Sequence, residues 1–394
     1  MERNRLFKLF KALGTFFLLV GLVTTVAGGF LVLSNYQQLG RAVRVISLIK
    51  TQALTPPGTS ELIDGAMRGM VGALDDPYSV YLDPKDYRHI EQHITGTYGG
   101  VGLIIGLDEE KRLVVVSPFK GTPGHRAGIL AGDLIVTIDQ QDTTGMDLEK
   151  AASLMQGQPG TKVTLGIYRK GLDRPKEYAI TREVIQVPSV EGKMLNAYPG
   201  IAYISLTTFN EHTAQELGKL LEEFRAEQAR AFILDLRNNA GGTLGAAVKV
   251  ADYFVPEGPI VHIVGRFRKQ EYKADRERID LPLAVLVNEG TASASEIVAG
   301  AIKDTKAGTV IGEKTFGKGI VQTVFELTGG GALKLTTDKY LTPAKNDIHK
   351  KGIEPDVVVP LEGEQESRAL LNAPDPADDP QLRKAIEILQ RQMK

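Results

Sequence analysis

The chain has 394 residues, long enough for two or three domains, and its 42 glycines and 42% hydrophobic residues indicate a globular protein. A formal net charge of −1 gives no reason to expect a nucleic acid as partner. Because the chain contains no cysteine, disulfides, thiol catalysis and cysteine-ligated metals are excluded.

The N-terminal residues predict a segment that enters a membrane. Residues 12–33 carry no charge over 22 positions, enough to cross the hydrocarbon core of a bilayer. The residues before them are basic and should stay in the cytoplasm: Arg3, Arg5, Lys8 and Lys11. We expect an uncleaved signal anchor at residues 1–34, with a cleaved signal peptide as the alternative. Both place the rest of the chain outside the cytoplasm, in a periplasmic, lumenal or extracellular space.

Residues 35–95 predict a helical region. Apolar residues recur at helical spacing on both sides of Pro56-Pro57. His89 and His93 lie four positions apart, so they share a helical face and could hold a metal. The zinc-protease motif needs a glutamate directly after its first histidine, however, and Ile90 occupies that position. We therefore expect a solvated helix face without a metal.

Residues 96–182 have the pattern of a separate, β-rich module. Apolar runs predict four strands and one helix: Leu103–Leu107, Leu113–Ser117, Asp133–Ile138 and Lys162–Arg169 as strands, and Leu148–Met155 as the helix. The module resembles a PDZ domain, whose carboxylate-binding loop is matched by Gly100, Val101, Gly102 and Leu103. Small residues there can point backbone N–H groups at a terminal carboxylate, while the adjoining strand edge accepts a peptide. A Gly-rich hairpin turn is the alternative.

Residues 183–360 alternate strands and helices, which predicts an α/β layer structure. Strands are expected at 201–206 and 231–236, and helices at 213–227 and 244–254. In such a sheet the ligand site lies at the carboxyl ends of the strands. The second strand ends there in a turn that contains Gly241 and Gly242.

A further strand and helix flank a turn that is rich in hydroxyl groups. The apolar run from Pro282 to Val287 predicts a buried strand, and residues 291–295 are small N-cap candidates before a helix beginning near Glu296. Such a turn can expose a serine nucleophile beside free helix N–H groups. No histidine follows before position 349, whereas Lys318 lies between two glycines, where burial would favour its neutral form. An exposed lysine is the alternative, and spacing alone does not decide.

Two motifs here resemble those of the carboxyl-terminal processing peptidases, the tail-specific protease family: TASASEI at 291–297 and GEKTFGKGIVQ at 312–322. The resemblance implies Ser293 as the nucleophile, Lys318 as the general base and Gln322 as the partner that orients the lysine. It also implies a crotonase- or Clp-like α/β protease core with an inserted PDZ domain, the core comprising residues 183–360 with a contribution from 58–95.

The same resemblance suggests how an oxyanion would be held. One donor would be the N–H of Ala294, and the other is assigned to Gly241, with Gly242 as the second choice. A plain strand-to-helix turn is the alternative for either glycine. Asp304, eleven residues after Ser293, matches an acidic position that matters in some members, and its alternative is an ordinary residue at a helix end.

Residues 361–394 predict an acidic, proline-bearing linker and then a short amphipathic helix from about 381 to 393. The helix would dock on its own core or on another subunit.

The expected protein is a membrane-anchored, extracytoplasmic serine endopeptidase that needs no cofactor. Its PDZ domain would capture protein substrates with free, apolar C-termini, and a second copy of the chain or an adaptor protein would be a further partner. The alternatives are a catalytically inactive PDZ scaffold, an acyl-CoA hydratase-like enzyme and a trypsin-like PDZ protease. The intact Ser293, Lys318 and Gln322 set argues against the first, and the Gly-x-Ser-Gly motif of the last is missing.

Overall fold

The computed structural model describes residue 21 and residues 36–171, 173–275, 278–361 and 375–394. The chain forms two compact units, residues 1–81 and 82–394. The predicted membrane segment at 12–33 lies outside the described residues, apart from Gly21. Within the described ranges, no helix combines the length and the apolar character that crossing a bilayer requires.

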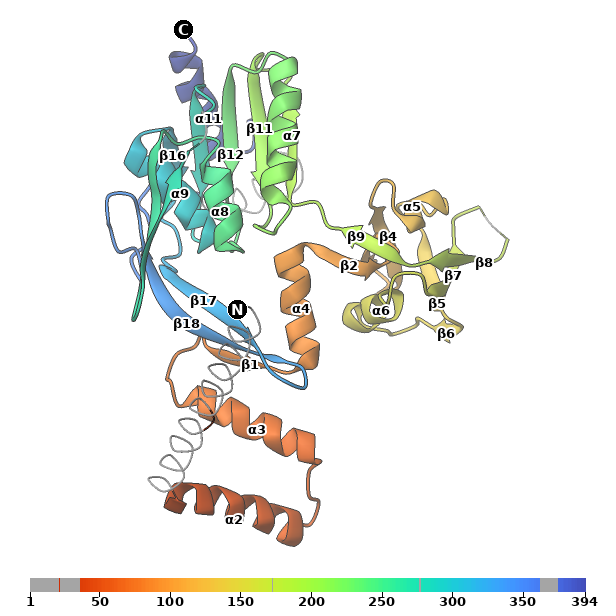
Figure 1. Cartoon of the computed structure of the whole chain (residues 1–394). Helices are drawn as coiled ribbons and strands as arrows, with labels where there is room; N and C mark the ends of the chain where they lie inside the picture. The colour runs from red at the N-terminus through yellow and green to blue at the C-terminus, as the bar shows by residue number, and fades with distance from the viewer. Residues whose placement is uncertain (1–20, 22–35, 172, 276–277, 362–374) are drawn as a thin grey trace, which may run out of the picture. The chain divides into compact units, whose positions relative to one another are not determined.

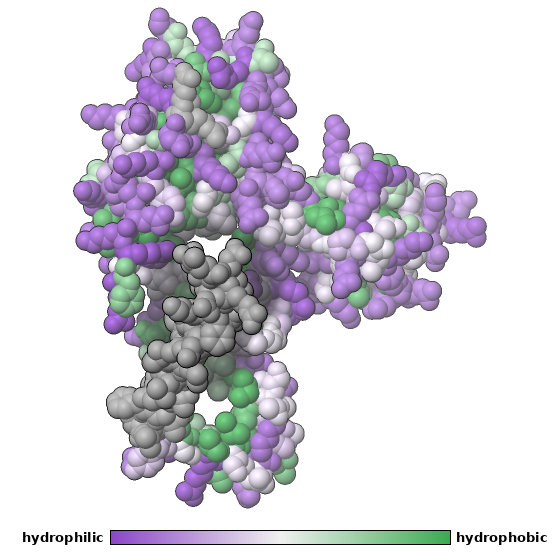
Figure 2. All heavy atoms as spheres, viewed as in Figure 1, coloured by the Kyte–Doolittle hydropathy of each residue, from purple (hydrophilic) through white to green (hydrophobic). Residues whose placement is uncertain are grey.

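The first unit contains two helices, α2 (Tyr36–Gln52) and α3 (Thr59–Gly72), where the sequence predicts a helical region. Neither helix has a buried residue, and large apolar side chains are exposed on both, among them Val43 and Met70. Figure 2 shows apolar side chains on this helix pair.

After β1 (Val80–Leu82), the second unit begins with α4 (Pro84–Thr95). The carboxylate of Asp83 caps this helix by accepting N–H groups of its first turn, and Pro84 fits there because it has no N–H to satisfy. His89 and His93 are both exposed, which agrees with a solvated helix face.

The β-rich module has a sheet of its own, with strand order β3-β4-β5-β7-β8 and β6 paired to β5. Its elements are β3 (Leu103–Leu107), β4 (Leu113–Pro118), α5 (Pro123–Arg126), β5 (Leu134–Ile138), β6 (Gln141–Asp142), α6 (Leu148–Met155), β7 (Lys162–Tyr168) and β8 (Lys176–Thr181). The four predicted strands and the predicted helix are confirmed to within one residue at each end. A separate ribbon of β2 (Thr97–Gly100) and β9 (Glu183–Gln186) joins the entry and exit of the module.

The α/β core that follows the β-rich module is built on a six-stranded sheet of order β10-β11-β12-β15-β16-β19, parallel except for the edge strand β10. The strands are β10 (Val190–Met194), β11 (Ile201–Leu206), β12 (Ala231–Asp235), β15 (Leu283–Val287), β16 (Thr309–Gly312) and β19 (Val357–Val358). Side chains alternate between two cores, as a pleated strand requires. On β12, Phe232 and Leu234 belong to one core, and Ile233 belongs to the other.

Helices cover both faces of this sheet (Figure 1). The first core contains side chains of α7 (Thr213–Ala226), α8 (Leu244–Ala251) and α9 (Ala294–Thr305). The second core contains the apolar side of α11 (Pro380–Gln392): Leu382, Ala385, Ile386 and Leu389. The C-terminal helix therefore docks on its own core, which was one of the two alternatives left open by the sequence.

A second sheet of the core joins β17 (Ile320–Glu326), β18 (Ala332–Leu341), β13 (Gly258–Gly265) and β14 (Lys269–Ala274), each antiparallel to the next. Strands β13 and β14 were not predicted from the sequence. Residues 266–268, which include Arg266 and Arg268, form the hairpin turn between these two strands, and Phe267 is 90% exposed.

Candidate active site

The site lies where β15 turns into α9. The Asn288 N–H donates to the Thr291 hydroxyl at 3.0 Å, and this hydroxyl donates to the Leu236 carbonyl at 2.8 Å. Helix α9 begins at Ala294 rather than near Glu296 as expected, so its N-cap is Ser293.

Ser293 has a strained backbone, with φ of 55° and ψ of −115°. Such strain persists only where the surroundings enforce it, and it occurs at strand-to-helix turns that hold a serine nucleophile. Both backbone groups are held: the N–H donates to Glu296 Oε2 at 2.9 Å, and the carbonyl accepts the Tyr340 hydroxyl at 3.0 Å. Burial, and then the charge of Glu296, raise the pKa of Tyr340 well above its ordinary value, so this hydroxyl keeps the proton that it donates.

A single buried carboxylate joins the two sequence motifs. Oε2 of Glu296 accepts the N–H of Ser293 and, at 2.8 Å, the N–H of Lys318. Its Oε1 accepts the Thr315 hydroxyl at 2.6 Å and the Gly317 N–H at 2.7 Å. The backbone N–H groups of Ser293 and Lys318 donate to the same oxygen, Glu296 Oε2. Their nitrogens therefore lie no more than about 6 Å apart. The fold thus brings the candidate nucleophile and the candidate base together.

The environment of Lys318 favours the neutral amine. Burial lowers the pKa of Lys318 from its ordinary value of 10.5, the nearby charge of Lys334 lowers it further, and Glu296 acts in the opposite direction. The side chain is half-buried, so its ammonium form is incompletely hydrated. A larger neutral fraction near neutral pH is what a general base requires.

The glycine turn approaches the nucleophile closely. Gly241 has φ of +98°, and a Cβ added to it would lie 2.7 Å from Ala294 N and 3.0 Å from Ser293 Cβ. Its own N–H donates to Asn239 Oδ1 at 2.8 Å. In the described part of the chain, neither the Ala294 N–H nor the Gly242 N–H has a hydrogen-bond acceptor. These two donors are therefore available to an oxyanion, whereas the N–H of Gly241 is engaged.

Replacing Gly241 by alanine should reduce peptidase activity by at least about 100-fold, the effect of losing one oxyanion donor. The new methyl group would occupy the space in front of the Ala294 N–H, and the positive φ is unfavourable for alanine. Steady-state hydrolysis of a peptide substrate measures the loss. Gly245→Ala, in α8 with no atom within 4 Å of the added Cβ, is the matched control and should retain activity. Equal activity of the two variants would contradict the role of the turn.

Gln322 and Asp304 differ in their relation to the site. Gln322 lies on β17 beside a register shift of the ladder, and its buried Nε2 has no partner among the described residues.

Asp304 lies at the far end of α9, about 16 Å along the helix from Ser293. Its carboxylate accepts the Thr342 hydroxyl and, at 2.9 Å, the Ala344 N–H. These contacts make Asp304 a support for the turn after β18, at a distance from the reacting groups.

Backbone hydrogen bonds hold the loop between β2 and β3, where the sequence predicts a carboxylate site. The Val101 carbonyl accepts the Gly124 N–H at 2.8 Å, and the Gly102 carbonyl accepts the Phe119 N–H at 2.9 Å. Gly102 has φ of +73°, and a Cβ there would clash with the side chain of Thr122. The N–H groups of Val101 and Gly102 have no acceptor within the described ranges, so they remain free for a ligand.

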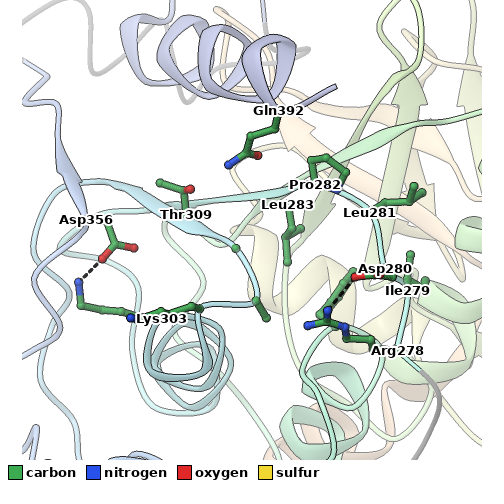
Figure 3. A pocket seen from close by; sticks show the side chains of 14 residues that line it. Arg278, Ile279, Asp280, Leu281, Pro282, Leu283, Lys303, Thr309, Asp356 and Gln392 are labelled. Carbon is green, nitrogen blue, oxygen red and sulfur yellow. Dashed lines mark hydrogen bonds and ion pairs between the residues drawn. The ribbon is translucent and has the colours of Figure 1, made fainter. Parts of the chain in front are cut away.

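A cavity of about 620 Å³ lies at the opposite ends of the strands, where β15 and β16 begin (Figure 3). Its lining includes Leu283, Thr309 and an ion pair of Lys303 with Asp356 at 2.5 Å. None of the residues predicted for the site lines this cavity, so it is separate from the chemistry at Ser293.

The sequence analysis missed the residues that hold the site in place. In the sequence, Glu296 was used only to recognise the motif. A glutamate three residues after a serine N-cap has the spacing of a capping box, so its contact with the Ser293 N–H could have been predicted. Tyr340 and Asn239 reach the site from β18 and from the turn after β12, and no local pattern points to either.

Ser293 has a strained backbone, and its N–H and that of the half-buried Lys318 donate to the same Glu296 carboxylate. Together with the attached PDZ module, this arrangement defines a serine-type protease. Residues 200–359 match the family model of peptidase family S41, residues 114–169 match the PDZ domain, and residues 31–86 match the N-terminal domain of the activating protease CtpB.

The chain belongs to the carboxyl-terminal processing proteases of family S41. It is 40% identical to a carboxyl-terminal-processing protease of Synechocystis over 82% of this chain and 76% of the relative. It is 36% identical to a carboxy-terminal-processing protease of Bartonella bacilliformis over 90% of this chain and 89% of the relative. In fold it is similar to a putative S41 protease of Bacteroides fragilis, with 17% identity, a TM-score of 0.52, and coverage of 86% of this chain and 93% of that one.

Proposed function

We propose that this protein is an extracytoplasmic endopeptidase that cleaves peptide bonds through an acyl-enzyme on Ser293, with Lys318 as the general base. One observation carries the proposal: the Glu296 carboxylate binds the backbone of both residues, which are 25 positions apart in the sequence. The same carboxylate also binds Thr315 and Gly317, so the segment before the lysine is fixed as well.

In the first half of the reaction, the neutral Lys318 amine takes the proton of the Ser293 hydroxyl. The serine oxygen then forms a bond to the scissile carbonyl carbon, and the negative oxygen that results accepts the Ala294 N–H. Gly242 is the available second donor, and Gly241 can serve only if its N–H leaves Asn239. The protonated lysine returns its proton to the leaving amine as the C–N bond breaks.

In the second half, water attacks the acyl carbon while the neutral Lys318 accepts a proton from that water. The bond between the acyl carbon and the Ser293 oxygen then breaks, and Lys318 returns the proton to this oxygen as the carboxylic acid product leaves. Gln322, whose Nε2 has no hydrogen-bond partner within the ranges that the structure describes, orients the lysine. The reaction uses only groups of this chain and water.

The PDZ module would select substrates by their C-terminus. The free N–H groups of Val101 and Gly102 bind the terminal carboxylate, and β3 pairs with the peptide. The exposed Ile104 on that strand favours an apolar residue at the end of the substrate.

Amidation of the substrate's C-terminus is expected to raise KM with little change in kcat, because it removes the charge that the loop binds. Two peptides of one sequence, one a free acid and one an amide, should be compared at constant ionic strength. Equal KM values would contradict carboxylate recognition by this loop.

Residues 1–34 would anchor the chain in a membrane, with the catalytic part outside the cytoplasm. This part of the proposal depends on the uncharged stretch and its basic flank alone. Carbonate washing of membranes from expressing cells tests it: an uncleaved anchor stays with the membrane, and release of the full-length chain would contradict it.

A further inference from the structure

We propose that the C-terminal helix α11 positions the oxyanion turn, residues 238–242, through an ion-pair network centred on Arg237. The inference depends on the proposed function, since it assigns a catalytic purpose to that turn. Arg237 and the first residues of α11 would be positioning residues, without contact to substrate.

Arg237 follows β12 directly and connects it to α11. Its Nη2 lies 2.6 Å from Asp235 Oδ2 and 2.8 Å from Asp379 Oδ2. Its Nη1 donates to Gln381 Oε1 at 3.1 Å. Asp379 is also the N-cap of α11, because its other oxygen accepts the Leu382 N–H at 2.9 Å. The first turn of the C-terminal helix therefore meets the base of the oxyanion turn.

The network is almost fully buried, so its charges depend on one another. The side chains of Arg237 and Asp379 are 2% and 1% exposed. Although burial alone would lower it, the carboxylates of Asp235 and Asp379 raise the pKa of Arg237 above its ordinary value. The Tyr203 hydroxyl donates to Asp235 at 2.7 Å. Neutralising Asp379 would leave Arg237 paired with Asp235 and hydrogen-bonded to Gln381, so the loss falls on the ion pair that links Arg237 to the start of α11.

The oxyanion turn is held on its other side by residues 288–295, the strand-to-helix elbow between β15 and α9. The Asn238 N–H donates to Asn288 Oδ1 at 2.8 Å. The Asn239 carbonyl accepts the Ser295 hydroxyl at 2.9 Å and the Ala292 N–H at 3.0 Å. The segment that ends β11 holds the turn as well: Asn239 Nδ2 donates to the Leu206 carbonyl at 2.7 Å, and the Gly241 carbonyl accepts the Phe209 N–H at 3.0 Å. Arg237, which neighbours Asn238 in the chain, connects the turn to α11. A shift of α11 would thus be transmitted through Arg237 to the turn that carries the Gly242 N–H.

The test is the Asp379→Asn variant of the full chain. Asparagine keeps the shape and the N-cap but removes the charge opposite Arg237. The assay is run well below the unfolding temperature of the variant. We expect kcat to fall about 10- to 100-fold with KM unchanged, because a small displacement of a catalytic hydrogen-bond donor lowers the rate strongly. Asp379→Glu should recover part of kcat. Should Asp379→Asn not fold, Gln381→Met removes the hydrogen bond from Arg237 and the one that Gln381 donates to the Val359 carbonyl, keeps the ion pair with Asp379, and should show a smaller loss.

The matched control is Glu387→Gln, which removes only exposed ion pairs of α11 with Lys384 and Arg391. It should behave as the wild type. Amide hydrogen exchange provides a readout that needs no activity: residues 238–242 should exchange faster in Asp379→Asn than in the control. If the wild type cleaves no peptide, the proposed function fails while the exchange comparison still decides the role of α11. Unchanged exchange of the turn, or an unchanged kcat, in a folded Asp379→Asn protein would overturn the inference.

Discussion

Replacing Ser293 by alanine is expected to abolish peptide hydrolysis, with a loss in kcat of at least about 10⁴-fold. No other group in the mechanism can form the acyl-enzyme. The variant should fold, because the hydrogen bonds that fix this residue are made by its backbone N–H and carbonyl. Binding of a substrate C-terminus to the PDZ module should persist, and calorimetric titration with a non-cleaved peptide measures it.

Ser295→Ala is the control for this substitution. The Ser295 hydroxyl is buried and donates to the Asn239 carbonyl, which keeps a second bond from the Ala292 N–H. We expect a stability loss of about 1 kcal/mol and retained activity. Turnover by purified Ser293→Ala, together with inactivity of a folded Ser295→Ala, would reverse the assignment of the nucleophile.

Replacing Lys318 by methionine is expected to reduce kcat by at least about 10³-fold, because methionine fills similar space but accepts no proton. Lys314→Met is the control in the same segment. Lys314 is exposed and forms an ion pair with Glu354 at 2.7 Å, so its loss should leave activity unchanged. Comparable losses in the two lysine variants would argue against a specific base.

The pH dependence of the wild type follows from the neutral state that Lys318 needs. Activity should rise with pH and level off above the pKa of Lys318, which burial and then Lys334 hold below 10.5. Lys334→Gln removes a positive charge and should raise the pKa of Lys318, so the activity rise moves to higher pH. A pH profile identical in wild type and Lys334→Gln would contradict the electrostatic part of this account.

The sequence predicted those elements whose pattern is local. The four strands and the helix of the PDZ module have apolar runs of the right length, and their observed ends differ from the predicted ends by one residue at most. Strand β14 escaped detection because its sequence, KQEYKA, is mostly polar and becomes a strand only through pairing with β13. The start of α9 was placed two residues late because Ser295 was taken as part of the cap.

Those site residues that belong to the two short motifs could be predicted from the sequence. Ser293 and Lys318 could be named from them, but the reason that they meet could not. That reason is a buried carboxylate with four donors, two of them from the Thr315–Gly317 segment. Tyr340 is 47 residues from Ser293, so its bond to the serine carbonyl exists only in the folded chain.

The rate at which a fluorophosphonate labels the protein, followed from neutral to alkaline pH, tests the central claim most directly. Peptide mapping by mass spectrometry identifies the labelled residue. We predict labelling at Ser293, with a rate that rises as Lys318 loses its proton and that falls by orders of magnitude in Lys318→Met. Labelling of another serine, or an equal rate in wild type and Lys318→Met, would contradict a serine nucleophile activated by this lysine.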